Sequence, residues 1–277
     1  MESDMHEGSA GVTVLGDRYE LGEEIAVGGA AVVHRGHDRV LGRAVAIKLL
    51  AATLELGRDH DRFEREIAIL GQLQHPHIVP VLGSGLHDGT LYYVMPFAPD
   101  GTLADRLKSE GPLSIEAVRT LATEMTSALA RAHGFGVIHR DVKPSNVLVS
   151  GDHYWLADFG IVRFLQDAES SRFTPSGIML GSPRYMSPEQ LVGRAGVDYR
   201  TDLYSLGLVL YECLAGVAAF PARTAEASAR LRLVSDPITV RAHRPDVDAA
   251  LEGVVMRALR GDVEQRWTSA AEMAAAL

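Results

Sequence analysis

The feature that most constrains the fold of this chain is a change in hydrophobic pattern at Pro99, Asp100 and Gly101. Before this break, the pattern predicts short strands over residues 19–25, 32–37, 44–50, 79–83 and 91–97, and one helix over 59–74. After it, the pattern predicts helices over residues 103–108, 114–133, 201–215, 248–260 and 269–277, and a small hairpin within 136–160. Strands followed by helices are typical of an α+β protein with two unequal lobes.

We expect three regions along the chain. Residues 1–17 are expected to form a flexible tail, because they have neither the basic start nor the apolar core of a signal peptide. Residues 18–98 are expected to form a small lobe, an antiparallel sheet with one main helix, and residues 99–277 a larger, mostly helical lobe. A cleft between the two lobes is the default place for a binding site.

Charge and cysteine content exclude several classes of protein. The net charge of −9 argues against a general electrostatic grip on nucleic acid or on an anionic membrane. Cys213 is the only cysteine, so an intrachain disulfide and a cysteine-based zinc cluster are both excluded. The most apolar stretch, residues 203–220, contains Glu212 and is shorter than the roughly 20 residues that span a bilayer. These observations predict a cytoplasmic protein that contacts neither nucleic acid nor membrane.

Two charged residues stand where apolar ones are expected. Glu66 lies three residues after Phe63 and four before Leu70, on the apolar stripe of the predicted helix over 59–74. Lys48 lies in a predicted strand with apolar neighbours on both sides. A charge on an inward face needs a partner, so a Lys48–Glu66 pair would satisfy both. Alternatively, Lys48 reaches solvent and Glu66 pairs with Arg62 one turn back.

Two loops carry oxygen-bearing side chains in a fixed order. Asp141 and Asn146 lie in the loop after the helix predicted over residues 114–133, and Asp158 follows the predicted hairpin. Oxygen ligands of this kind suit magnesium, which binds proteins through one or two carboxylates and keeps several waters. We choose Asn146 and Asp158 as the ligands, which leaves Asp141 to orient a substrate hydroxyl and accept its proton. Taken singly, an aspartate in a loop is most often a solvated turn residue.

The ordered set resembles a protein kinase, and it is most similar to bacterial serine/threonine kinases of the eukaryotic-like (Hanks) type. The resemblance runs from about residue 18 to residue 277 and rests on the runs 45–48, 139–146, 158–160 and 187–189. It implies ATP as phosphate donor, Mg²⁺ or Mn²⁺ as the metal, and proteins with serine or threonine hydroxyls as acceptors. It also implies roles for the following residues: Lys48 at the α and β phosphates, Glu66 as its helix partner, Asp141 as catalytic base, Lys143 at the γ-phosphate, and Asn146 and Asp158 as metal ligands.

The resemblance also outlines a nucleotide pocket. Met95 takes the gatekeeper position, Pro96 and Ala98 belong to the hinge, and the apolar walls are Ile25, Val33, Ala46 and Leu148. The other reading of Ile25 and Val33 is ordinary core. The glycine-rich loop includes Ala26, Gly28 and Gly29, and it departs from the family pattern because Ala26 and Ala31 replace its first and third glycines. Alanine there is expected to cost backbone strain and to place a methyl group near the phosphates, which leaves a weaker ATP affinity open.

Further residues are assigned through the resemblance alone. Glu189 and Arg266 match a structural ion pair, and Asp202 matches an aspartate that braces the catalytic loop, although it could also cap its own helix. The activation segment spans residues 158–189, and Thr174 and Ser176 lie where relatives are phosphorylated. A phosphate there could dock on Arg140 and order the segment.

The sequence therefore predicts a serine/threonine protein kinase that autophosphorylates its activation segment, with a homodimer as one route to phosphorylation between copies. The alternative is a pseudokinase, a nucleotide-binding scaffold, which Ala26 and Ala31 would favour. A small-molecule kinase is disfavoured by the run 187–189 and by the long activation segment. Because the chain stops inside a predicted helix, we expect a catalytic domain cut from a longer protein, which could be the cytoplasmic part of a membrane-anchored one; the alternative is a short complete kinase.

Overall fold

A computed structural model of the chain describes residues 13–28, 31–50, 58–159, 183–193 and 197–277. The chain divides into two compact units, one formed by Met1–His60 and Val81–Phe97 and the other by Asp61–Pro80 and Ala98–Leu277. An antiparallel sheet and one helix are followed by a mostly helical part, so the α+β class is confirmed. The lobe bounds at residues 18–98 and 99–277 and the tail at 1–17 stay predictions.

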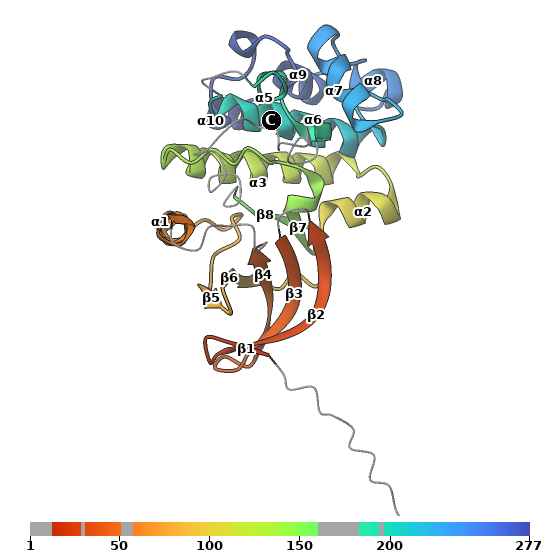
Figure 1. Ribbon diagram of the computed structural model, residues 1–277. Helices are drawn as coiled ribbons and strands as arrows, with labels where there is room; N and C mark the ends of the chain where they lie inside the picture. Colours follow the sequence, from red (N-terminus) through yellow and green to blue (C-terminus); the bar gives the residue numbers. More distant parts are fainter. Residues whose placement is uncertain (1–12, 29–30, 51–57, 160–182, 194–196) are drawn as a thin grey trace, which may run out of the picture. The chain divides into compact units, whose positions relative to one another are not determined.

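The first unit is built on an antiparallel sheet with the strand order β1-β2-β3-β4-β6-β5 (Figure 1). The strands are β1 Val14–Leu15, β2 Tyr19–Gly28, β3 Ala31–Asp38, β4 Arg43–Leu50, β5 Gly83–His87 and β6 Thr90–Pro96. The strands expected over residues 19–25, 32–37, 44–50 and 91–97 correspond to β2, β3, β4 and β6.

Alternation along the central strands gives the sheet two different faces. On β4, Val45 and Ile47 are fully buried and pack in one cluster with Tyr92 and Val94 of β6. Successive strand residues point to opposite faces, so Ala46 and Lys48 lie on the other side of the sheet. Burial of one face thus fixes which face Lys48 occupies.

The strand predicted over residues 79–83 is wrong. Ile78 instead makes an isolated bridge with Leu156 of the second unit, and the sheet strand β5 begins at Gly83. The sequence of β5 lacks an apolar alternation because two tyrosine hydroxyls approach its backbone. A Cβ atom at Gly83 would lie 2.7 Å from the Tyr19 hydroxyl, and one at Gly85 would lie 2.8 Å from the Tyr92 hydroxyl.

The second unit is mainly helical. Its elements are α1 Arg58–Gln72, which starts at the end of the first unit, α2 Leu103–Glu110, α3 Ile115–Gly134, η1 Pro144–Asn146, β7 Val147–Ser150, β8 His153–Leu156, η2 Pro183–Tyr185, α5 Pro188–Leu191, α6 Arg200–Ala215, α7 Ala225–Val234, α8 Val240–His243, α9 Ala249–Ala258, η3 Val263–Gln265 and α10 Ala270–Ala275. The hairpin β7–β8 and the long helices were predicted, whereas α5, α7 and α8 were not. Helices α5 and α8 have only four residues each, and the buried residues of α7 are Ser228, Ala229 and Arg232, so none of the three carries a periodic apolar stripe.

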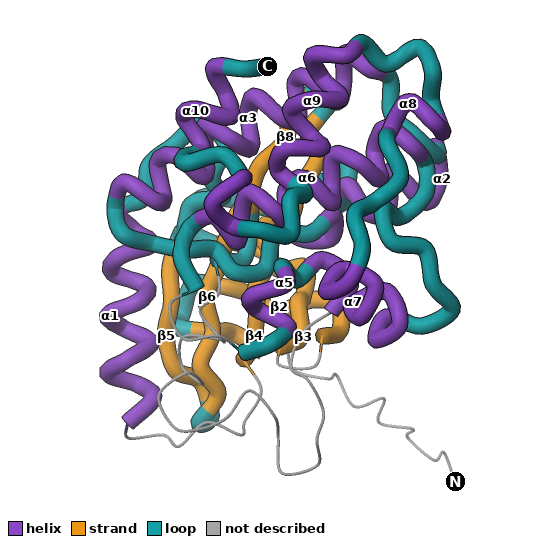
Figure 2. Tube along the Cα trace, turned by 90° about the horizontal axis from the view of Figure 1, so that it is seen from above, coloured by secondary structure: helices purple, strands orange, loops and turns teal. Residues whose placement is uncertain are grey.

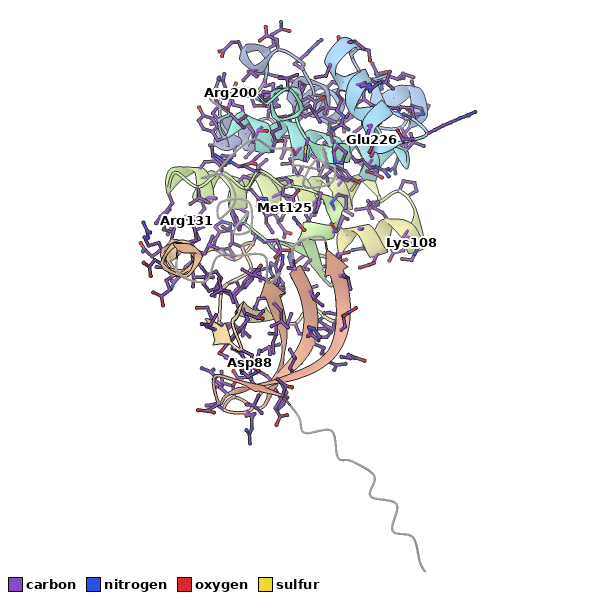
Figure 3. All side chains as sticks on the ribbon, in the orientation of Figure 1. Asp88, Lys108, Met125, Arg131, Arg200 and Glu226 are labelled. Atoms are coloured by element: carbon purple, nitrogen blue, oxygen red, sulfur yellow. The ribbon has the colours of Figure 1, made fainter. Side chains whose placement is uncertain are left out.

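Helices α3 and α6 form the centre of this unit, and β8 lies against α3 (Figure 2). Met125 of α3 is fully buried in the core between them, whereas Lys108, Arg131 and Glu226 are exposed (Figure 3). Nearly every residue of α6 is buried, which explains why its sequence is apolar on all sides. Among the residues that the structure describes, no helix is long and apolar enough to cross a membrane.

Helix starts follow the capping residues. Ser114 accepts from Ala117 N–H at the start of α3, and Ser269 accepts from Glu272 N–H at the start of α10. The capping-box spacing of Ser269 and Glu272 is only half used, because the Glu272 carboxylate accepts from Thr268 N–H instead.

Two helix glycines provide a matched test of the packing between α6 and α9. A Cβ atom at Gly207 would lie 2.9 Å from the Ala258 Cβ, whereas one at the exposed Gly253 would meet nothing within 4 Å. We expect Gly207→Ala to lower the free energy of unfolding, because overpacking costs about 1–3 kcal/mol and exceeds the gain in helix propensity. Gly253→Ala should raise it by up to about 1 kcal/mol. Thermal unfolding of both variants measures the difference, and a Gly207→Ala variant as stable as wild type would contradict the close packing.

Candidate functional site

The loop that carries Asp141, residues 138–146, is called here the catalytic loop. It follows α3 after a turn in which Gly136 adopts a φ of 72°, a conformation that favours glycine. The loop closes with the single turn η1, where Asn146 N–H donates to the Lys143 carbonyl at 2.9 Å. Helix α3 and the hairpin thus hold both ends of the loop.

A buried carboxylate fixes the middle of the catalytic loop. Asp202, in the first turn of α6, is fully buried and accepts from His139 N–H at 2.9 Å and from Arg140 N–H at 2.7 Å. Its Oδ2 atom also lies 2.8 Å from His133 Nε2 at the end of α3. Arg140 has a φ of 63°, a strained conformation for a non-glycine residue, which Asp202 stabilises by satisfying two successive N–H groups. The side chain of Asp202 therefore serves the loop, and it does not cap α6, whose N-cap is Tyr199.

The side chains of Asp141, Lys143 and Asn146 converge within this loop. Lys143 Nζ lies 2.7 Å from Asp141 Oδ2, and Asn146 Nδ2 donates to the same oxygen at 3.1 Å. A second bond from Asn146 Nδ2 reaches the Asp141 carbonyl at 2.9 Å. The Asp141 side chain stays 23% exposed, so its carboxylate is held in one orientation and is still open to a substrate.

Asp158 is placed next to this loop by the residues on either side of it. The N–H group of Ala157 donates to the Asn146 carbonyl at 2.8 Å, and the Ala157 carbonyl lies 2.8 Å from His139 Nε2. The buried ring of Phe159 packs on the His139 ring with centroids 4.6 Å apart. Asp158 itself has a φ of 60° between these two anchors.

The donor set formed by Asn146 and Asp158 fits a divalent cation such as Mg²⁺. The side-chain amide of Asn146 is buried, and its Nδ2 atom donates two hydrogen bonds, both to Asp141. The Oδ1 atom of Asn146 is therefore the atom that could bind a metal ion. The carboxylate of the half-buried Asp158 supplies a second hard oxygen. An amide oxygen and a carboxylate are ligands that Mg²⁺ accepts together with water and phosphate oxygens.

In the first unit, five predicted or neighbouring residues share one face of the sheet. Residues directly opposite each other in antiparallel strands point to the same face. Val33 and Tyr93 are opposite Lys48, and Met95 is opposite Ala46. The Lys48 ammonium lies 5.9 Å from the centre of the Tyr93 ring. The sheet register thus brings the predicted lysine, two predicted walls and the predicted gatekeeper together.

The remaining predicted pocket residues lie in both units. Ile25, which is 46% exposed, lies with Ala26 and Gly28 on β2, and Pro96 ends β6. Leu148 on β7 and Ala98 belong to the second unit, as does Glu66 on α1. Glu66 is half-buried on the same helix as the buried Phe63. Gly29 lies outside the described residues, and the Lys48–Glu66 pair, which would join the two units, stays a prediction.

The expected strain at the alanines of the glycine-rich loop is not found. Ala26 and Ala31 lie within β2 and β3, paired with Val33 and Gly28, and neither has a positive φ. The extended backbone at both positions suits any residue, so the alanines fit the strands without the cost that the sequence suggested.

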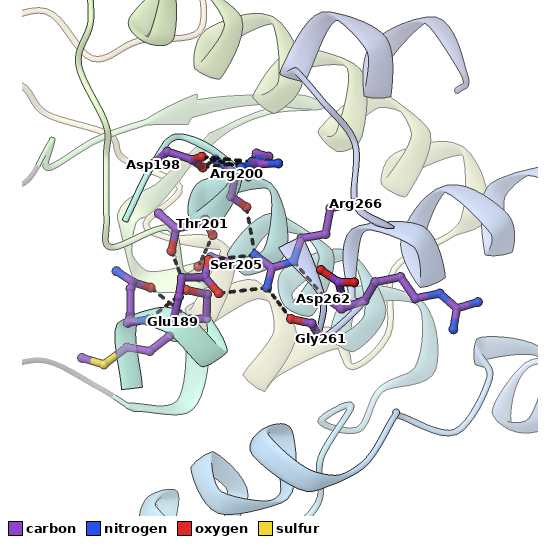
Figure 4. A network of polar contacts seen from close by, with 12 residues as sticks. Glu189, Asp198, Arg200, Thr201, Ser205, Gly261, Asp262 and Arg266 are labelled. Atoms are coloured by element: carbon purple, nitrogen blue, oxygen red, sulfur yellow. Dashed lines mark hydrogen bonds and ion pairs between the residues drawn. The ribbon is translucent and has the colours of Figure 1, made fainter. Parts of the chain in front are cut away.

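Glu189 and Arg266 form a buried bidentate ion pair (Figure 4), with Nη1–Oε1 at 2.8 Å and Nη2–Oε2 at 2.9 Å. Arg266 also donates from Nε to the Arg260 carbonyl at 2.7 Å and lies over the Tyr204 ring. Burial disfavours the charge on Glu189, but the hydrogen bonds and charge of Arg266 outweigh it, so the pKa of Glu189 lies below its ordinary value. The pair ties α5 to the C-terminal part of the unit.

Two anchoring residues were not recognised from the sequence. Glu212 of α6 accepts from the Tyr185 hydroxyl and pairs with Arg184, each at 2.7 Å. Its signal was a carboxylate inside an apolar run, which needs a partner when the helix is buried. Gln190 of α5 donates from Nε2 to the Arg140 carbonyl at 2.9 Å, and its sequence signal was the capping-box spacing from Ser187, which indicates a helix start and not this contact. Thr174 and Ser176 lie outside the described residues.

Comparison with known proteins gives a consistent result. The family model of the protein kinase domain matches residues 19–276. Serine/threonine-protein kinase PknB of Mycobacterium tuberculosis (strain H37Rv) is 40% identical, with 95% of this chain and 43% of that protein covered. The probable serine/threonine-protein kinase PknB of Lactococcus lactis is 36% identical, with 94% of this chain and 41% of that protein covered. The chain therefore spans less than half the length of these relatives.

The Glu189–Arg266 pair generates a stability prediction. Arg266→Met leaves the buried Glu189 carboxylate unpaired, so the free energy of unfolding should fall by about 3–5 kcal/mol at neutral pH. The exposed Arg260, 3.9 Å from Asp236, is the control, and Arg260→Met should cost less than about 1 kcal/mol. Denaturant unfolding measures both, and equal losses would contradict the assignment.

The same pair has a defined pH dependence. Because the folded-state pKa of Glu189 is depressed, its contribution to stability is complete above the unfolded-state pKa of about 4.3 and is lost as pH falls through the folded-state pKa. In Arg266→Met the carboxylate takes up a proton more readily. The stability difference between wild type and variant should therefore shrink as the pH falls from neutral, first through the pKa of Glu189 in the variant and then through its depressed pKa in the wild type. A difference that does not change with pH would contradict the depressed pKa.

Proposed function

Because this chain belongs to the protein kinase domain family, we propose that it transfers the γ-phosphoryl group of ATP to serine or threonine hydroxyls of proteins. The observation that carries the proposal is the arrangement around Asp141, with Lys143 at 2.7 Å and Asn146 at 3.1 Å from the same carboxylate oxygen. A protein kinase acts on protein acceptors and uses ATP with a divalent metal. The similarity to serine/threonine kinases supports the choice of acceptor hydroxyl.

In the proposed reaction, Asp141 orients the acceptor hydroxyl and takes its proton as the hydroxyl oxygen bonds to the γ-phosphorus, and the bond from that phosphorus to the bridging oxygen breaks to release ADP. Lys143 serves two purposes: it fixes the Asp141 carboxylate and places a positive charge beside the transferring phosphoryl group. Asp202 contributes indirectly by holding the backbone on which Asp141 stands. The rate thus rests on positioning and preorganised electrostatics, and no covalent protein intermediate is needed.

The other assigned residues bind the phosphate donor in this proposal. Lys48 would contact the α and β phosphates, with Glu66 as its expected partner. The adenine ring would be bound by the residues Ile25, Val33, Ala46, Met95, Pro96, Ala98 and Leu148, and Ala26, Gly28 and Gly29 would also belong to the nucleotide site. Asn146 and Asp158 would hold Mg²⁺ or Mn²⁺, which neutralises phosphate charge when bound.

Regulation by autophosphorylation belongs to the same proposal. A phosphate on Thr174 or Ser176 would supply an anion for Arg140, which precedes Asp141 and whose carbonyl is held by Gln190. A homodimer is proposed for phosphorylation between copies, together with a cytoplasmic location for this domain.

The pseudokinase alternative rested on Ala26 and Ala31. It loses its argument from backbone strain, because both alanines adopt ordinary extended conformations. The presence of the complete set of Lys48, Glu66, Asp141, Asn146 and Asp158 favours an active enzyme.

Removal of the proposed base tests the function directly. Asp141→Asn should lower the turnover number for phosphorylation of a protein acceptor by at least about 10²-fold, because the amide cannot accept the proton. Lys48→Met should abolish transfer by removing the charge at the phosphates. Asp152→Asn, at an exposed position of the β7–β8 turn, is the matched control and should behave as wild type. Circular dichroism checks that each variant is folded, and a folded Asp141→Asn protein with wild-type turnover would overturn the role of Asp141.

Autophosphorylation is tested separately. The purified chain incubated with ATP and Mg²⁺ or Mn²⁺ should gain phosphate on Thr174 or Ser176, whereas Asp141→Asn should gain none. Mass spectrometry of peptides from residues 160–182 measures this. If phosphate appears only elsewhere while an added acceptor is phosphorylated, the kinase assignment stands and the two proposed sites are wrong. If the rate of autophosphorylation per molecule of protein does not change with protein concentration, transfer takes place within one chain, which would argue against transfer between copies.

A further inference from the structure

Arg232 of α7 is a buried cation without a carboxylate partner among the residues that the structure describes. It is 3% exposed, and no aspartate or glutamate in the described chain lies within ion-pair distance of it. Burial, reinforced by the nearby charge of Arg184, lowers the pKa of Arg232 to about 10. Arg266, the other deeply buried arginine, has a bidentate carboxylate. A buried charge without a counter-charge costs stability, so the contacts of Arg232 point to a role other than stabilising the fold.

The guanidinium of Arg232 connects α7 with the segment before α5. Its Nη1 atom donates to the Met186 carbonyl at 2.6 Å, which is its shortest contact. Nε and Nη2 turn back to Ser228 one turn earlier on α7, and Ser228 Oγ donates to the Phe220 carbonyl at 2.8 Å. The planar fork of an arginine makes these contacts at the same time, which a lysine with a single nitrogen cannot do.

The segment that Arg232 reaches, residues 183–190, is held at nearly every position. Ser205 donates to the Tyr185 carbonyl at 2.8 Å, and Ser187 Oγ lies 2.6 Å from Thr201 Oγ1. These contacts come from α6, as does the Glu212 carboxylate bound to Tyr185. Within the described residues, Arg232 makes the one side-chain hydrogen bond from α7 to this segment. Without it, the Met186 carbonyl would lose its side-chain donor, while the other half of the same peptide, the Ser187 N–H group, would keep its bond to Gln190 Oε1 at 3.0 Å.

The segment also touches the catalytic loop. Gln190, whose side chain forms a capping box with Ser187, donates to the carbonyl of Arg140, the residue before Asp141. A protein acceptor must bring its hydroxyl within hydrogen-bond distance of Asp141, so its flanking residues have to pass the segment bonded at this point. Asn146 and Asp158, which are proposed to hold the metal of the phosphate donor ATP, are held in place instead through contacts of Ala157, Phe159 and His139.

We propose that Arg232 is a positioning residue for the protein acceptor, and that its bond to the Met186 carbonyl keeps residues 183–190 in the conformation that binds the acceptor chain. This inference rests on the proposed kinase function. The inference distinguishes binding of the protein acceptor from binding of ATP. The bond to the Met186 carbonyl affects acceptor binding and does not involve the residues proposed to bind ATP.

The test uses three variants of the full chain with ATP, Mg²⁺ and dephosphorylated casein as acceptor. Arg232→Met keeps the apolar stem and removes the bond. Arg232→Lys keeps the charge but has a single donor nitrogen in place of the three of the guanidinium. Arg230→Met changes an exposed arginine on the same helix and serves as the control. The readouts are the KM for casein, the KM for ATP, the rate of ATP hydrolysis without casein, and the midpoint of thermal unfolding.

We expect Arg232→Met to raise the KM for casein about tenfold, because losing one charge-assisted hydrogen bond within the protein lowers the population of the acceptor-binding conformation of residues 183–190 by about that factor. The KM for ATP and the ATP hydrolysis rate should change less than twofold, and Arg232→Lys should restore part of the casein affinity. Arg230→Met should match wild type.

An unchanged casein KM in Arg232→Met would overturn the inference. So would a parallel loss of ATP hydrolysis and casein phosphorylation, which would mark a general structural role. If Arg232→Met does not fold, Arg232→Lys decides: a casein KM equal to wild type counts against the inference, and a selective rise supports it. A folded wild-type chain that phosphorylates nothing would instead contradict the proposed function, and the inference would fall with it.

Discussion

The buried carboxylate of Asp202 is the interaction on which the geometry of the catalytic loop depends. It binds the N–H groups of His139 and Arg140 and lies beside His133, so the start of α6 holds both the end of α3 and the loop. The left-handed backbone conformation of Arg140 would cost about 1–3 kcal/mol in isolation. The hydrogen bond from its N–H group to the fixed Asp202 carboxylate offsets this cost. Asp141, the next residue, takes its position from that backbone.

Helix α6 is the framework for most of these attachments. Because it is buried along almost its whole length, its few polar side chains are fixed by packing before they form any bond. Asp202 reaches the catalytic loop, and Thr201, Ser205 and Glu212 reach the segment before α5. An apolar helix can thus act as a precise support for polar chemistry. The Glu189–Arg266 pair adds a second support by joining α5 to the segment after η3.

In the first unit, the sheet determines on which of its two faces the side chain of Lys48 lies. Strand alternation places Val45 and Ile47 in a fully buried cluster, and Lys48 must then project from the opposite face with Val33 and Met95. A register shift by one residue would bury the charge and expose the core, so hydrophobic burial indirectly specifies the placement of a functional group. In the second unit, by contrast, functional residues are placed by hydrogen bonds to loop backbone.

Sequence alone determined the α+β class, most of the long helices and central strands, and the residue types that carry the proposed chemistry, because these follow from short-range periodicity and ordered motifs. It did not reveal β5, where the hydroxyls of two tyrosines elsewhere in the sheet leave no room for side chains at Gly83 and Gly85. It also suggested backbone strain at Ala26, which the strand pairing does not impose. The partners of Glu212, Gln190 and Arg232 were also decided by tertiary structure. Each of these contacts joins residues far apart in the chain, and their pairing depends on how whole helices pack, which no local pattern encodes.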